Sequence, residues 1–379
     1  MKLSYTILSI LLLGMLFTTI AAKAQHPDRN RNDELLNLLI KKNVLSQKEA
    51  DSLSTTLSLK EKKDKENQHY ISFGSDAIQI SGLVQTRYQG FAQDGVNSTF
   101  DLHRARLDVK GDINDNWSYQ VYTEFAGTTK LLDAYTTYKI AAYLKFTAGQ
   151  FKVPFSLESL FADSQLEFID RAQVVDAFTG RAKDVIGNQN GRDIGIQVSG
   201  SFIKIDNRYL FDYTLGVFNG AGYNVTTDNN NRKDIAGRLT VHPLNNLSIS
   251  ADFYGGQGNY GVPAKNQTRN RGGFDTRYIY NRLSLTAEYD KGTDGIINRD
   301  GWYVQASYFI IAKKLQLTAK YDTYDPDKDI ATDRSNWYIG GLNYLFNDRA
   351  RFTIDYSYRR EEIIQPKNNL LSLQLQLAF

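Results

Sequence analysis

The sequence predicts an all-β protein: a transmembrane antiparallel β-barrel of about 16 strands, preceded by a short N-terminal helical segment in the periplasm. Three observations lead to this fold class. From residue 77 onward apolar and polar residues alternate almost without interruption, as they do along a strand with two unlike faces. The segment Leu370–Phe379 has one wholly apolar face and one small, polar face. Aromatic residues make up 12% of the 379 residues, which suits the girdles at two membrane–water interfaces.

Residues 1–24 have the pattern of a secretory signal peptide. Lys2 supplies the charge, residues 7–20 form the apolar stretch, and Ala22-Lys23-Ala24 fits a small-residue cleavage site. A membrane-anchor helix is the alternative, but the stretch is short for a span. Later windows are too polar for a membrane helix, and the chain has no cysteine for disulfides, thiol chemistry or lipid attachment. An exported chain of this kind can still cross a membrane as a closed barrel.

Residues 25–70 differ from the rest of the chain. Asp33–Ile40 has a helical pattern, Ser46–Glu49 has the form of a capping box, and residues 60–66 are charged. These features predict a helical or coiled segment and a linker, which could contact peptidoglycan, a periplasmic partner or its own neighbours. A partly disordered arm is the alternative.

Residues 71–379 are predicted to form the barrel. The alternation predicts strands that begin near residues 77, 99, 116, 131, 143, 191, 208, 232, 246, 271, 282, 299, 314, 333, 350 and 369. Most would be about 9–14 residues long, as tilted membrane strands are, whereas soluble strands average about 5–6. A soluble sandwich would show the same period with its polar face in water. Strand length and an even strand number favour a barrel with an aqueous lumen.

The last predicted strand shows the expected division of faces. Its apolar set should face lipid and its polar set the lumen: Leu371, Leu373, Leu375, Leu377 and Phe379 against Ser372, Gln374 and Gln376. We expect Phe379 to serve also as an assembly signal during membrane insertion.

Residues 154–187 interrupt the alternation with a long segment that is rich in apolar residues, among them Phe155, Leu160, Phe168, Val174 and Phe178. A connection of this length is usually functional or disordered, and its apolar content argues against disorder. We expect it to fold into the lumen and set the constriction. An extracellular cap is the alternative.

Basic residues in and beside this segment, and on the predicted lumen wall, are candidates for lining the pore and binding anions: Arg171, Arg181, Lys183, Arg104, Arg106, Lys145, Lys152, Arg192 and Arg238. Carboxylates such as Glu158 and Asp163 nearly balance them within the segment. The formal net charge of +3, or +1 without Lys2 and Lys23, indicates neither a nucleic-acid partner nor strong anion selectivity.

Four motifs resemble the phosphate-selective porin O and P family: Phe100–Leu107, Gly149–Glu158, Phe168–Phe178 and Gly191–Gln197. The resemblance extends over about residues 75–379, and the N-terminal segment resembles that of Bacteroidetes-type members. It implies a porin of sixteen strands in the outer membrane of a Gram-negative bacterium, surrounded by lipid, assembled as a homotrimer and without a cofactor. It also implies an inward third loop and passage of small anionic solutes such as phosphate or polyphosphate. His103 stands where the family often has another arginine.

Two other functions remain open at this stage. A surface or adhesion barrel would bind a partner through its loops and conduct no ions. A barrel hydrolase would need an activated nucleophile, and His103 is the one histidine in a predicted strand. Asp325, Asp327, Asp329 and Asp333 have the spacing of a calcium loop but lack its glycine and final glutamate, which favours a solvated loop. We therefore predict no enzyme activity and no metal site.

Overall fold

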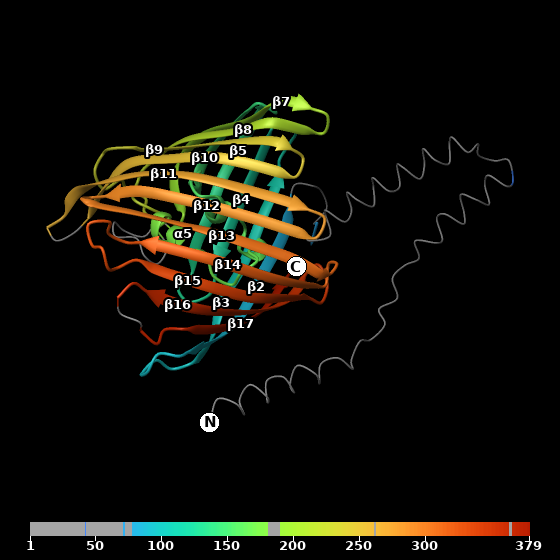
Figure 1. Cartoon of the computed structure of the whole chain (residues 1–379). Coiled ribbons are helices and arrows are strands. Elements are labelled where there is room, and N and C mark those ends of the chain that lie inside the picture. Colours follow the sequence, from blue (N-terminus) through green and yellow to red (C-terminus); the bar gives the residue numbers. More distant parts are fainter. Residues whose placement is uncertain (1–41, 43–70, 73–77, 181–189, 261–262, 364–365) are drawn as a thin grey trace. The chain divides into compact units, whose positions relative to one another are not determined.

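A computed structural model of the chain describes residues 42, 71–72, 78–180, 190–260, 263–363 and 366–379 (Figure 1). The chain divides into two units, residues 1–68 and 69–379. The predicted signal peptide and almost all of the predicted helical segment lie outside the described residues, so these boundaries stay predictions.

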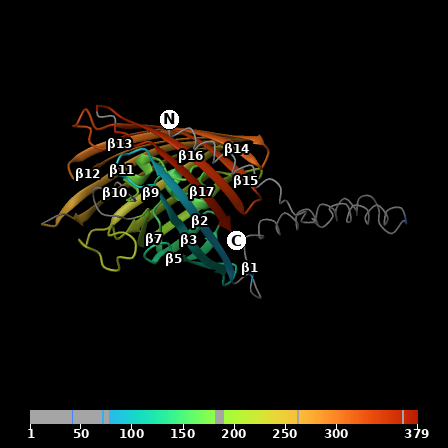
Figure 2. The ribbon, with the colours of Figure 1, turned by 90° about the horizontal axis from the view of Figure 1, so that it is seen from below.

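Sixteen strands of the described chain form a closed antiparallel barrel in which each strand pairs with its neighbours in sequence. Their bounds are β2 Gln79–Phe91, β3 Thr99–Asp112, β4 Trp117–Glu124, β5 Lys130–Ala141, β6 Leu144–Lys152, β7 Arg192–Ile205, β8 Arg208–Phe218, β9 Asp234–Leu244, β10 Leu247–Tyr260, β11 Lys265–Tyr280, β12 Leu283–Asp294, β13 Ile297–Ile311, β14 Leu315–Asp325, β15 Ser335–Leu345, β16 Ala350–Glu361 and β17 Leu370–Ala378. The barrel closes where β17 pairs with β2 (Figure 2). A two-residue strand, β1 (Ile71–Ser72), pairs with the start of β2.

The predicted strands are confirmed, and one predicted start is wrong by more than two residues. Strand β11 begins at Lys265 rather than near residue 271, because Lys265–Asn270 is polar and shows no apolar alternation. Backbone pairing with Gly255–Tyr260 nevertheless extends the strand, so the β10–β11 connection is a long hairpin instead of a loop.

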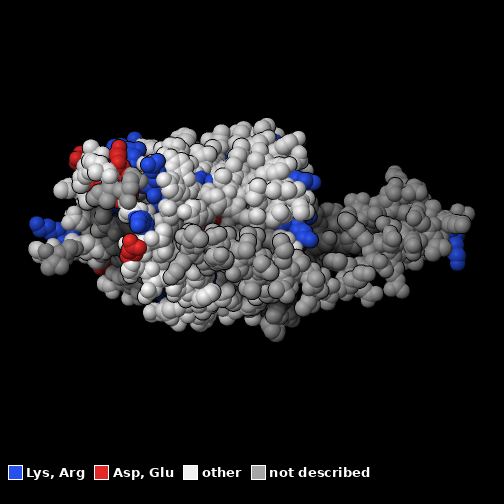
Figure 3. Space-filling model, turned by 60° about the horizontal axis from the view of Figure 1, so that its bottom comes forward, with Lys and Arg blue, Asp and Glu red and all other residues white. Residues whose placement is uncertain are grey.

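The alternation places apolar side chains outside the barrel and polar ones inside. On β17, Leu375 and Leu377 are exposed, whereas Gln374 and Gln376 are buried. Figure 3 shows a face on which charged residues gather toward the ends of the barrel and are sparse between them. A single closed sheet with a polar interior excludes the soluble sandwich. Among the described residues, no helix is long and apolar enough to cross a membrane.

The connections differ in length between the two ends of the barrel. At one end they are tight turns, some with non-glycine residues at positive φ, such as Asp206, Asn281 and Lys313. At the other end they include residues 153–191, 219–233 and 326–334. The first of these carries helices α4 (Leu157–Leu160), η2 (Asp163–Gln165) and α5 (Gln173–Phe178).

The core of the protein lies between this first connection and the barrel wall. Phe155, Val174 and Phe178 of the connection pack with Phe218 and Tyr303 of the wall, and all five side chains are almost fully buried. Helix α5 contacts β12, β13 and β14. The described part of the connection therefore lies inside the barrel, and we call it the inner loop.

Candidate functional site

Carboxylates on the lumen face hold the backbone of the inner loop. Four wall residues on alternate strands accept hydrogen bonds from loop N–H groups: Asp252 from Ser156 (3.0 Å), Glu288 from Leu157 (2.8 Å), Asp322 from Gln173 (2.9 Å) and Asp355 from Ile169 (2.7 Å). Buried N–H groups in loops and in the first turn of a helix have no backbone acceptor of their own and need such partners. These bonds fix the loop against half of the wall, from β10 to β16.

Two glycines of the wall make room for helix α5. A Cβ on Gly301 would lie 2.9 Å from Val174 Cβ, and a Cβ on Gly292 would lie 2.8 Å from the Phe178 ring. Larger side chains at these positions would collide with the helix and also with the backbone carbonyl oxygens of Thr323 and Asn270, which lie 2.7 and 2.5 Å from the Cβ positions. The glycines therefore set how closely α5 approaches the wall.

Asp163 of η2 is the centre of a charged cluster between the loop and β3. The guanidinium groups of Arg104, Arg106 and Arg171 all pair with its carboxylate, with Arg104 at 3.2 Å. Arg106 also pairs with Glu124 at 2.5 Å. Burial disfavours the charged form of Arg171, but the carboxylates of Asp163 and Glu158 more than offset this and raise the pKa of Arg171 above its ordinary value. Arg171 is therefore a fixed cation.

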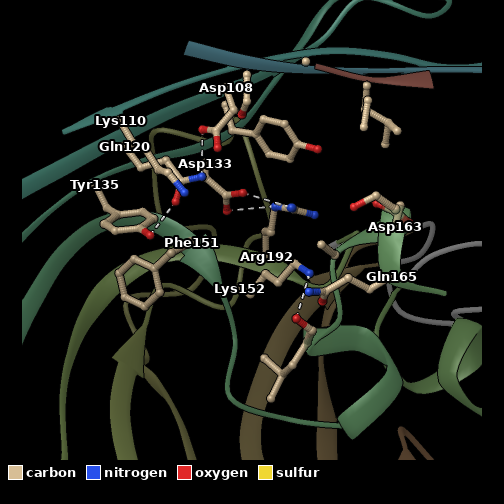
Figure 4. A pocket seen from close by; sticks show the side chains of 18 of the residues that line it. Asp108, Lys110, Gln120, Asp133, Tyr135, Phe151, Lys152, Asp163, Gln165 and Arg192 are labelled. Carbon is tan, nitrogen blue, oxygen red and sulfur yellow. Dashed lines mark hydrogen bonds and ion pairs between the residues drawn. The ribbon is translucent and has the colours of Figure 1, made fainter. Parts of the chain in front are cut away.

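A cavity of about 880 Å³ lies beside this cluster, between loop residues 160–165 and the wall formed by β2–β7 and β17 (Figure 4). Its charged lining is balanced and consists of Lys110, Lys145, Lys152 and Arg192 with Asp108, Asp133, Asp163 and Asp348. The cavity is the part of the lumen that the inner loop leaves open on this side.

Most candidate cations that line the lumen are bound to protein groups. Arg192 donates two hydrogen bonds of 2.9 Å to Asp133, and Lys152 donates to the carbonyl oxygens of Leu160 and Phe161. Arg238 pairs with Asp252 and Asp275, and none of these three residues lines the cavity. The charged groups of these three side chains therefore stabilise the protein structure through these contacts.

Lys145 differs from the other candidates. It lines the cavity, and its ammonium group forms no hydrogen bond or ion pair with any described residue. Arg181 and Lys183 lie outside the described residues, so their roles stay predictions. The seven candidates that the structure describes thus comprise three arginines around Asp163, three side chains bound to other protein groups, and the free ammonium group of Lys145.

Sequence reasoning named Asp163 only as one of the carboxylates that balance the charge of the loop, not as the centre of a cluster, and it did not identify the wall carboxylates that hold the loop. Alternation correctly places Asp252, Glu288, Asp322 and Asp355 on the inner face. That pattern carries no information about which backbone groups they meet, because the partners lie 96 or more positions away in sequence.

Neither a hydrolase site at His103 nor a calcium site at Asp325–Asp333 is favoured by the arrangement of the described residues. His103 Nδ1 lies 2.8 Å from Gln374 Oε1 and also contacts Arg104, so it is not joined to a nucleophile. The 326–334 connection contains Asp327, Asp329 and Asp333 of the calcium-loop spacing. Within it, Lys328 donates a hydrogen bond of 2.5 Å to Asp300, and this bond raises the pKa of Lys328. The described residues contain no group of three or more His, Cys, Asp or Glu that could hold a metal ion by itself.

Comparison with known proteins gives the family. The model of the family described as phosphate-selective porin O and P matches residues 78–292 and 256–379, which together span most of the chain. The chain belongs to this family. This porin is accordingly a protein of the Gram-negative outer membrane. No curated protein matches its sequence.

Solved structures share the fold of this porin at low identity. A loop-deletion mutant of OmpT, an outer membrane protein of Vibrio cholerae, has a TM-score of 0.59 at 16% identity, covering 80% of this chain and 99% of that one. OprB of Pseudomonas putida has a TM-score of 0.59 at 11% identity, covering 80% and 94%. OmpF of Salmonella typhi, in complex with daunomycin, has a TM-score of 0.58 at 11% identity, covering 82% and 100%.

Proposed function

We propose that this porin is a passive diffusion channel, not an enzyme, for small hydrophilic solutes with a weak preference for anions such as phosphate or polyphosphate. The observation that carries the preference is the cluster around Asp163. Three guanidinium groups converge there on the Asp163 carboxylate, and the Glu124 carboxylate pairs with one of them. Three positive charges therefore face two negative charges. The cluster keeps an excess positive charge beside the cavity.

The excess is small, so the preference should be small. Ion selectivity follows from fixed charges of one sign that line a passage. Here the charged cavity lining, which includes Lys145 and Asp163, is balanced, and only the three arginines around Asp163 tip the balance toward anions. The inner loop would narrow the lumen and bring solutes close to these groups. The family description supports phosphate as a solute but is the only support for it.

Bilayer recordings test the proposal. Purified, refolded protein should give discrete conductance steps, and reversal potentials in asymmetric KCl should show a modest excess of Cl⁻ permeability. Phosphate or pyrophosphate added in increasing concentration should then reduce the chloride current. Absence of conductance would favour a surface or adhesion barrel, and a cation preference would contradict the anion proposal.

We also propose that the porin assembles as a homotrimer and that residues 25–70 contact peptidoglycan or a periplasmic partner. One of the similar structures is a trimer form of OmpT from Vibrio cholerae, which supports the first point. Cross-linking in detergent should give a trimer band. Protein lacking residues 25–70 should still form channels but should no longer sediment with purified peptidoglycan.

A further inference from the structure

Asp290 on β12 is a buried carboxylate without a partner in the described chain. Its side chain is on the lumen face and the residue is 0% exposed. Neither of its oxygens accepts a hydrogen bond, and it forms no ion pair. A buried charge without a partner is strongly unfavourable, so such a group takes up a proton, a counter-charge or an ion.

The structure places a second carboxylate beside it. Asp252 of β10 pairs with Gly273 of β11, and Gly273 pairs in turn with Asp290. A Cβ on Gly273 would collide with Asp252 Oδ1 and with Asp290 Oδ1. The two oxygens thus converge above Gly273, within 2.2 and 2.4 Å of the point where a Cβ would lie, and only a glycine permits this approach. Asp252 Oδ1 also lacks a hydrogen-bond donor.

The surroundings are strongly negative. Asp275 and Glu288 are buried on the same face, next to one another across β11 and β12. Arg238 compensates Asp252 and Asp275, to which it is bound. Glu288 is hydrogen-bonded to Tyr303 and to two loop N–H groups. The Arg238 guanidinium group is therefore the one cation described here for four carboxylates. The Tyr303 hydroxyl and the loop N–H groups bind Glu288 and form no hydrogen bond with Asp290.

We propose that a hard divalent cation binds above Gly273, bridging Asp252 Oδ1 and Asp290 Oδ1, with water as its remaining ligands. Carboxylate oxygens are the ligands of Mg²⁺ and Ca²⁺, and Mg²⁺ typically keeps several waters while it binds one or two carboxylates. Two carboxylates suffice for this hydrated mode, which needs no group of three protein ligands.

The cation stabilises the start of the inner loop. Asp252 accepts the Ser156 N–H, and Glu288 accepts those of Leu157 and Glu158. Neutralising the repulsion among these carboxylates keeps them ionised and in place as acceptors. Binding of the ion is therefore coupled to the position of the loop, independently of which solute passes through the lumen.

The experiment uses full-length protein refolded in a non-ionic detergent, free of lipopolysaccharide, and treated with EDTA. Thermal unfolding and isothermal titration calorimetry are recorded with MgCl₂ and with CaCl₂ at constant ionic strength, with NaCl as the reference. Asp290→Asn and Gly273→Ala are compared with Asp348→Asn, which removes an exposed carboxylate in a turn.

Wild type and Asp348→Asn should bind one divalent cation and unfold at a higher temperature in its presence. Asp290→Asn should bind at least about tenfold more weakly, since even the loss of an outer-shell partner of a metal typically costs about 10–100-fold in affinity. It should also unfold at a higher temperature than the wild type in EDTA, because it lacks the repulsion. Wild-type protein that binds neither ion, or equal binding by Asp290→Asn, would overturn the proposal. So would stabilisation of the wild type by acid alone, because shared protons would then neutralise the site.

Discussion

Gly82 and Phe379 join the two ends of the barrel sheet. The Gly82 N–H donates to the Phe379 carbonyl at 2.8 Å, and the Phe379 N–H donates to the Gly82 carbonyl at 3.0 Å. The Phe379 ring occupies the place where a side chain on residue 82 would lie. Aromatic rings often cover glycines in this way and pin the register of paired strands. The ring therefore fixes how β17 meets β2.

Replacing Gly82 by Leu should weaken this closure. The new side chain would displace the Phe379 ring, and overpacking of this kind typically costs about 1–3 kcal/mol. The urea concentration at the unfolding midpoint of the refolded variant should be lower than that of the wild type. On a denaturing gel of unheated samples, a smaller fraction of the variant should migrate as the folded barrel. Gly340→Leu is the control, because nothing lies within 4 Å of a Cβ at that position. Equal midpoints for the two variants would show that the ring does not pin the seam.

Replacing Asp163 by Asn should both loosen the inner loop and increase anion preference. The substitution leaves Arg104, Arg106 and Arg171 around a neutral amide, and removing one partner of a buried ion pair typically costs about 3–5 kcal/mol. Reversal potentials should move further toward chloride, and proteolysis should cut the loop sooner. Asp348→Asn removes a carboxylate from the same cavity without touching the cluster. A shift of equal size there would show that total charge, not the cluster, sets selectivity.

The sequence predicts the barrel well because burial in a strand has a period of two. Leu375 and Gln376 already differ in face when the chain is read alone, and their exposure in the structure follows. The Lys265–Asn270 extension of β11 lacks this pattern, since both of its faces are polar, and only backbone pairing with β10 makes it a strand.

The site is less predictable, because it depends on partners that are distant in sequence. Arg192 and Lys145 look alike as basic residues of the wall. One is bound to Asp133 and the other is free, which follows from the positions of β5, β6 and β7 around the lumen. Likewise nothing in the sequence links Asp163 to Arg104, which lies on β3 and meets it only when the inner loop enters the barrel.

Lys145→Gln should reduce chloride preference while leaving stability unchanged. Its ammonium group faces the cavity and has no protein partner to lose, so the substitution removes charge without breaking a contact. The expected change is a shift of reversal potential toward the cation side in asymmetric KCl. Lys291→Gln, at an exposed position on β12, is the matched control. Unchanged selectivity in Lys145→Gln would exclude this lysine from the conducting path.

Gly301→Val should displace helix α5. Its new side chain would enter the space held by Val174, whose Cβ would lie 2.9 Å from the added Cβ. Because α5 is covalently part of the inner loop, we expect a lower unfolding temperature together with a changed single-channel conductance. Gly255→Val is the control, since the nearest atom to a Cβ there is Asn270 Oδ1 at 3.6 Å, an ordinary contact. A loss of stability with unchanged conductance would mean that α5 lies outside the path of the solute, and would assign conductance to the cavity beside Asp163 alone.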